Sequence, residues 1–153
     1  MTDHVFEFIA LECVRQNEPG GDEVYIRYGS EKVHPPGRGL VDFVAGGVLV
    51  NKQAGVPSAT LMEFLGRRGC REVADDPSTA EFRQTAIPQQ GLVVEVMEHD
   101  LWTRHDRIGR ILVSQRPTGG PVLHVFDTVQ GHYRLTYQVL AEQDAEAPEG
   151  VPG

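Results

Sequence analysis

Short apolar stretches separated by turn residues recur along most of the chain. Residues 133–139 alternate apolar and polar side chains, and Leu92, Val94 and Val96 fall on one face of another stretch. Alternation with a period of two is typical of a strand that is buried on one face. The pattern predicts a mainly β protein, an antiparallel β-sandwich of short strands. Further apolar stretches of strand length lie at 5–13, 24–28, 108–113 and 122–126.

The middle of the chain, residues 31–90, has a less regular pattern. Residues 40–50 are apolar around a Gly46-Gly47 pair. A glycine pair inside an apolar stretch fits two short strands around a turn, and it also fits one bulged strand.

A short helix is expected in the 58–85 region. Residues 58–68 fit a helix capped by Ser58, although the same stretch also fits a strand. The residues 78–81, Ser-Thr-Ala-Glu, have the spacing of a capping box, which predicts a short helix near 79–85.

Composition narrows the class of protein. The 153 residues include 17 glycines and 10 prolines, which is too many for a helical bundle. The length fits a single domain, which we expect to span residues 1–140. Residues 141–153 are acidic and rich in proline and glycine, so a disordered tail is predicted there.

The net charge excludes some partners. Acidic residues outnumber basic residues 22 to 14, which gives a formal net charge of −8. An acidic chain is repelled by the phosphate backbone, so no nucleic-acid partner is expected. Binding to an anionic membrane is expected only with Ca²⁺, because the chain and the lipid carry charge of the same sign.

The N-terminus carries no targeting signal that we recognise. No apolar run approaches the ~18 residues that a membrane-spanning helix needs, and Glu7 interrupts the apolar start where a signal peptide would be continuous. A cytoplasmic protein is therefore expected. Cys13 and Cys70 lie far apart and form no Cys-x-x-Cys pair, so two reduced cysteines are expected.

The most specific chemistry lies between two predicted strands. Glu98 and Asp100 are two residues apart at the end of one strand, and Asp106 begins the next. Alternate residues of a strand project to the same side, so Glu98 and Asp100 can converge, and the loop returns Asp106 toward them. Clustered carboxylates repel one another, and Ca²⁺ takes six to eight oxygen ligands in irregular loops. The loop therefore predicts a Ca²⁺ site, with a solvated acidic turn as the alternative.

This segment resembles a known family. The pattern acid-x-Asp-x5-Asp-x-Ile-Gly, from Glu98 to Gly109, looks like the third calcium-binding loop of C2 domains. Residues 17–26 resemble the first loop of that family, and residues 131–137 are similar to the last strand of small bacterial C2-like proteins. The resemblance covers about residues 5–30 and 91–140, whereas 31–90 matches no C2 pattern.

The resemblance implies a set of metal ligands and a partner-binding loop tip. Glu98 stands where the family usually has Asp, and Gln16 stands where it has an acidic residue before the first loop. These departures imply one weak Ca²⁺ site or a degenerate remnant. The implied metal ligands are Asp22, Glu98, Asp100, Asp106 and Glu18.

Trp102, the single tryptophan, lies in the middle of the acidic loop. By resemblance, a residue at such a tip inserts into a membrane interface or docks on a protein, and tryptophan suits both surfaces. The alternative is that Trp102 folds back onto the sandwich. Arg104 beside it can meet a phosphate or a carboxylate of the partner.

The sequence lacks the motifs of common enzyme classes. It has no nucleophile elbow and no phosphate-binding loop. We therefore expect a non-enzymatic C2-like binding module that engages a protein or membrane partner. The alternative is a structural subunit or adaptor of a larger assembly with a degenerate calcium site. A third reading is a metal-dependent hydrolase that uses Asp100, Asp106 and His105.

Overall fold

The architecture is taken from a computed structural model of the chain. The structure describes residues 4–35, 37–51, 54, 71–72, 82, 84–99 and 106–141, and for residues 71–72 it describes the backbone alone.

The described residues form eleven strands and no α-helix. The longest strands lie at the two ends of the chain, and the short ones lie in its middle. In chain order they are β1 (His4–Gln16), β2 (Asp22–Tyr28), β3 (Glu31–His34), β4 (Val41–Phe43), β5 (Gly47–Val50), β6 (Arg71–Glu72), β7 (Thr85–Ala86), β8 (Leu92–Glu98), β9 (Asp106–Val113), β10 (Val122–Thr128) and β11 (Gly131–Ala141).

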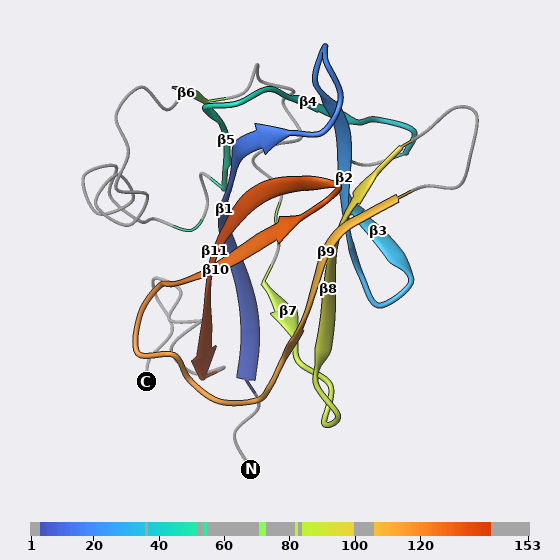
Figure 1. Cartoon of the computed structure of the whole chain (residues 1–153). Coiled ribbons are helices and arrows are strands. Elements are labelled where there is room, and N and C mark those ends of the chain that lie inside the picture. Colours follow the sequence, from blue (N-terminus) through green and yellow to red (C-terminus); the bar gives the residue numbers. More distant parts are fainter. Residues whose placement is uncertain are drawn as a thin grey trace.

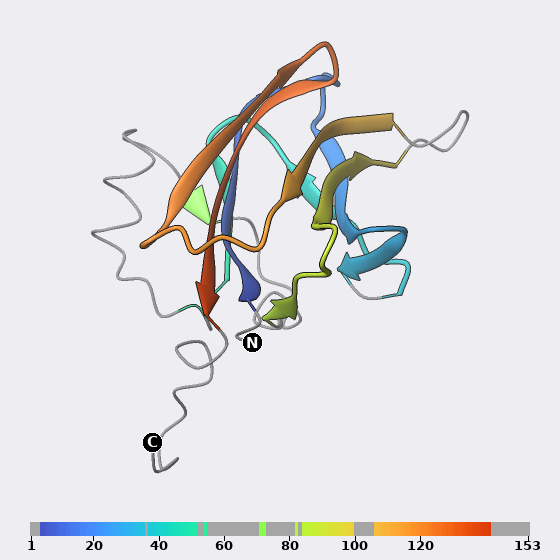
Figure 2. The ribbon, with the colours of Figure 1, turned by 90° about the horizontal axis from the view of Figure 1, so that it is seen from below.

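The strands form two sheets that face each other (Figures 1 and 2). Sheet A has the order β10-β11-β1-β5-β6, with β7 also paired to β1. Sheet B has the order β3-β2-β8-β9, with β4 also paired to β2. Every pairing is antiparallel except that of β5 with β6. The predicted antiparallel β-sandwich is confirmed.

The core follows the alternation read from the sequence. On β8, Leu92, Val94 and Val96 are buried in the main apolar cluster between the sheets. On β11, Tyr133 and Leu135 are fully buried in the same cluster. Burying one face of each strand supplies most of the driving force for this fold, because the stabilisation scales with the apolar area removed from water.

The apolar stretch 40–50 forms two strands that belong to different sheets. β4 pairs with β2 of sheet B, and β5 pairs with β1 of sheet A. The turn between them includes Gly46, whose φ of 90° is a backbone conformation that favours glycine. Of the two alternatives, the pair of short strands is the one formed.

The short helix expected near 79–85 is not formed at residues 82, 84 and 85. Phe82 is buried in the core and stacks on Phe8 with 4.0 Å between ring centroids, and β7 pairs with β1. Burial of an aromatic side chain and strand pairing outweigh a local capping preference. The rest of the 58–85 region, apart from the strand at 71–72, lies outside the described residues.

The C-terminal end of the predicted domain is only partly described. Ala141 still belongs to β11, so the sandwich extends one residue into the segment predicted as a tail, and residues 142–153 lie outside the described part.

Within the described residues, no helix is long and apolar enough to cross a membrane.

Gly109, in the Ile-Gly step of β9, lies where the two sheets meet. A Cβ atom added there would stand 2.1 Å from the ring of Phe126 on β10. We expect Gly109→Ala to push Phe126 from its place in the core and to lower the free energy of unfolding by about 1–3 kcal/mol in urea denaturation. The matched control is Gly20→Ala, where an added Cβ would meet nothing within 4 Å. Equal stability of the two variants would contradict the packing argument.

Candidate functional site: the acidic rim

One end of the sandwich gathers carboxylates from both predicted loops. The β1–β2 loop, residues 17–21, lies at the end opposite to where β1 begins and β11 ends (Figure 1). β2 and β8 are neighbours in sheet B, as are β8 and β9. The register sets Glu98 opposite Asp106, so the strand ends bring these two acids to one place. We call Glu18, Asp22, Glu98 and Asp106 the acidic rim.

Asp22, the first residue of β2, is fully buried and anchors the β1–β2 loop. Its carboxylate accepts hydrogen bonds from the backbone N–H of Asn17 at 3.1 Å and of Glu18 at 3.1 Å. A side chain that bonds nearby backbone N–H groups in this way fixes the loop conformation.

The same carboxylate links the two sheets. The hydroxyl of Tyr133, on β11 of sheet A, donates to Oδ2 of Asp22 at 2.6 Å. Tyr133 is itself fully buried, and its ring packs edge-on against Phe43. The short bond is typical of a hydroxyl that donates to a charged acceptor. The fold itself therefore supplies the Asp22 carboxylate with hydrogen-bond donors, without a ligand.

Glu98, the last residue of β8, has no such donors among the described residues. It is 1% exposed, and no described group donates a hydrogen bond to either oxygen of its carboxylate. A buried carboxylate without a partner is costly, so a proton or a cation is needed there.

The surroundings of Glu98 all disfavour its negative charge. Burial comes first, followed by a hydrogen bond with Asp22 and by the charges of Asp22, Glu18 and Asp106, and together they raise the pKa of Glu98 to about 8. A hydrogen bond between two carboxyl groups requires a proton on one of them. At neutral pH, Glu98 therefore holds a proton that it can donate to Asp22.

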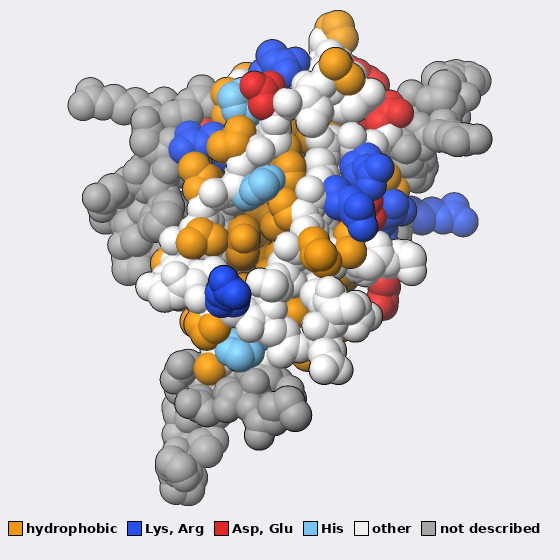
Figure 3. Space-filling view, turned by 60° about the horizontal axis from the view of Figure 1, so that its bottom comes forward, with side chains coloured by type: hydrophobic (Ala, Val, Ile, Leu, Met, Phe, Trp, Pro, Cys, Tyr) orange, Lys and Arg blue, Asp and Glu red, His pale blue; other side chains and the backbone are white. Residues whose placement is uncertain are grey.

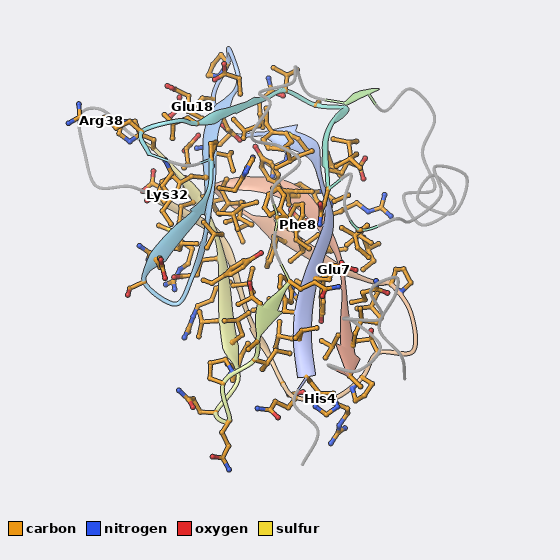
Figure 4. The ribbon with its side chains drawn as sticks, turned by 180° about the vertical axis from the view of Figure 1, so that it is seen from behind. His4, Glu7, Phe8, Glu18, Lys32 and Arg38 are labelled. Carbon is orange, nitrogen blue, oxygen red and sulfur yellow. The ribbon has the colours of Figure 1, made fainter. Side chains whose placement is uncertain are left out.

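The structure brings together four of the residues predicted as metal ligands. Asp22 and Glu98 are buried, Asp106 is half-buried, and Glu18 is exposed at the loop, where Figure 4 labels it. The other predicted residues, Asp100, Trp102 and Arg104, lie outside the described residues. Within the described part, no three His, Cys, Asp or Glu side chains are arranged to hold a metal ion.

Two residues have roles that the sequence did not indicate. The alternation over 133–139 predicted only a strand buried on one face, and no local signal shows that the Tyr133 hydroxyl reaches across to Asp22. Gln16 stands where the resemblance led us to expect an acid, and its Oε1 accepts from the backbone N–H of Ala45 at 2.8 Å. Gln16 therefore holds the β4–β5 turn against the loop.

No protein-family model matches the chain, and no curated protein matches it significantly. Among solved structures, it is similar to human GIVD cytosolic phospholipase A2 in complex with methyl gamma-linolenyl fluorophosphonate, at 11% identity and a TM-score of 0.42. A second structure of that enzyme, with terbium chloride also present, gives 10% identity and a TM-score of 0.41. Each match covers 92% of this chain and 17% of the other. Scores of this size carry no argument about family or function.

We expect Tyr133→Phe to lower the free energy of unfolding by about 1–3 kcal/mol, because it leaves the buried Asp22 carboxylate with one donor fewer. Urea denaturation measures the change. The control is Tyr137→Phe on the same strand, whose half-buried hydroxyl has no recorded hydrogen bond among the described residues and which should cost less than about 0.5 kcal/mol. A cost as small for Tyr133→Phe would contradict the inter-sheet link.

Glu98 predicts a pH dependence of stability. Its ordinary pKa of 4.5 is raised to about 8 in the folded protein, so between these values the folded state binds more protons than the unfolded state. The free energy of unfolding then falls as pH rises through this window. Urea denaturation from pH 5 to 9 should show this fall, and Glu98→Gln should flatten it. An identical pH profile for the variant would show that Glu98 is not the titrating group.

Proposed function

We propose that this chain is a non-enzymatic, C2-like binding module whose acidic rim takes Ca²⁺. The observation that carries the proposal is Glu98, a buried carboxylate whose two oxygens lack a donor among the described residues. An oxygen-preferring hard cation such as Ca²⁺ would satisfy both oxygens of such a group. Glu98, Asp106 and Glu18 supply oxygens from the described part, and Asp100 is the further ligand that the loop offers.

Asp22 has a supporting role in this proposal. Its carboxylate already accepts from the backbone of Asn17 and Glu18 and from the hydroxyl of Tyr133. It positions the loop that carries Glu18, and its charge adds to the attraction for a cation. With few charged ligands and an exposed Glu18, the affinity is expected to be weak, with a Kd of about 0.1–1 mM.

The bound cation would then favour a partner at the loop that contains Trp102 and Arg104. We propose a protein partner in the first place, because a chain with a net charge of −8 is repelled by anionic lipid. Binding to an anionic membrane requires Ca²⁺ to neutralise the rim.

The alternative function is that of a structural subunit with a degenerate calcium site. The observation in its favour is that, among the described residues, no three His, Cys, Asp or Glu side chains are placed so that they could hold one metal ion. In this alternative Glu98 keeps its proton, and its hydrogen bond with Asp22 only stabilises the fold.

Calorimetric titration with CaCl₂ separates the two functions. We expect saturable binding that Asp100→Asn, Asp106→Asn and Glu98→Gln each weaken at least about tenfold, because each removes one charged ligand. Glu31→Gln is the matched control, since Glu31 is an exposed acid at the β2–β3 turn. No heat at millimolar Ca²⁺, with no effect of Asp100→Asn, would exclude the calcium site and leave the structural alternative.

A further inference from the structure

The outer face of sheet B carries a concentration of positive charge that the acidic rim does not use. Lys32 on β3 is in register with Arg27 on β2, Arg27 is in register with Glu95 on β8, and Glu95 is in register with Arg110 on β9. Directly opposed residues of neighbouring strands share a face of the sheet. One acid therefore lies in a row with three bases, in a chain whose net charge is −8.

Glu95 is held by two of the neighbouring arginines. Its Oε1 accepts from Arg27 Nε at 2.8 Å, and its Oε2 accepts from Arg107 Nη1 at 3.0 Å. Burial alone would raise the pKa of Glu95, but the hydrogen bonds and charges of Arg27 and Arg107 outweigh burial and hold that pKa below its usual value. The single carboxylate is thus fully engaged, and the positive charge around it stays in excess. Figure 3 shows Lys and Arg side chains gathered on one side of the molecule around an acidic side chain.

A pocket of about 680 Å³ opens beside this row, which is the size of a small-molecule site. Its lining combines bases with one aromatic and one aliphatic side chain. The residues are Tyr25, Arg27, Ser30, Lys32, Gly37, Arg38, Leu40 and His99.

Lys32, one of the cations of the pocket, is held in place. Lys32 Nζ donates to the carbonyls of Gly37 and Gly39, each at 2.7 Å, and lies 5.6 Å from the centre of the Tyr25 ring. These bonds fix the loop that carries Arg38, and Figure 4 shows Lys32 and Arg38 on the same side of the molecule. The guanidinium of Arg38 is exposed, and no hydrogen bond of its side chain is recorded within the described residues.

Arg27 also keeps donors for a ligand. Its recorded hydrogen bond uses Nε, which leaves Nη1 and Nη2 with no recorded partner among the described residues. Its neighbour across the strands is Lys32, so an anion between the two side chains would meet two positive charges.

We propose that this pocket binds a small soluble organic phosphate. The forked guanidinium groups of Arg27 and Arg38 match the geometry of a phosphoryl group, and Lys32 adds a third positive charge. The ring of Tyr25 and the side chain of Leu40 offer an apolar wall for the carbon part of the ligand. This site is independent of the acidic rim and of its cation.

The ligand is a soluble molecule and not a membrane surface, for two reasons. The site is a pocket of limited volume, and an anionic bilayer would set many negative charges against a chain of net charge −8, whereas a small phosphate meets only the bases around it. A phosphoryl group bound among three bases needs no contact with a bilayer.

The test is a titration of the full chain, labelled with ¹⁵N, followed by NMR at constant ionic strength. The probes are phenyl phosphate, inorganic phosphate and phenol. We expect saturable shifts at Arg27, Lys32, Arg38 and His99 with phenyl phosphate, with a Kd of about 1 mM or tighter, weaker binding of inorganic phosphate, and none of phenol. Arg38→Gln should weaken phenyl phosphate binding about tenfold.

Arg116→Gln is the matched control, because it removes the same charge from an exposed position outside the pocket. Glu98→Gln should leave phosphate binding unchanged, so failure of the calcium site and failure of this pocket are distinguished. Equal weakening by Arg116→Gln, or shifts that do not saturate, would overturn the proposal. Pelleting with phosphatidylserine vesicles that Arg38→Gln abolishes, without binding of phenyl phosphate, would also overturn it and assign the bases to a lipid surface.

Discussion

The hydrogen bond between Tyr133 and Asp22 is the constraint on which the rim of this protein depends. It joins β11 of sheet A to β2 of sheet B at 2.6 Å, between two fully buried side chains. A buried carboxylate is tolerated only when donors surround it, and here backbone N–H groups of the β1–β2 loop also donate to Asp22. One side chain thus sets the loop conformation and fastens the two sheets at the same point.

This arrangement explains why neighbouring acids have different roles. Asp22 has donors from the loop and from Tyr133, so its charge is stabilised by the fold. Glu98 lies against Asp22 with no donor of its own among the described residues, so its charge is opposed by burial and by its neighbours. Two carboxyl groups in contact in one buried place share a proton or a cation, because both cannot be ionised and unpartnered. When Glu98 is protonated, its contact with Asp22 stabilises the fold. When Glu98 is ionised, its carboxylate would be open to a cation.

The sequence predicted the features that depend on local pattern. The alternation over 133–139 and at Leu92, Val94 and Val96 gave the right strands, because burial of one face imposes a period of two. β3 and β7 were not predicted. They have four and two residues, and strands this short form only because they pair with β2 and β1. The convergence of Glu98 with Asp106 was predicted from the strand ends, and the place of Asp22 beside them was implied only by the resemblance to C2 domains. The hydrogen bond of the Tyr133 hydroxyl could not be predicted, since its partner lies 111 residues away. The basic row was missed for the same reason, because its members come from separate strands.

The net charge of −8 conceals two regions of opposite sign that share one strand. On β8 and just after it, Glu98 turns inward to the acidic rim, and the next residue, His99, lines the basic pocket. The backbone N–H of His99 donates to the carbonyl of Glu23 at 2.8 Å, so both residues are fixed to β2. The side chains of residues 98 and 99 project to opposite faces of sheet B, so one strand end serves both an acidic and a basic region while each region keeps its own charge.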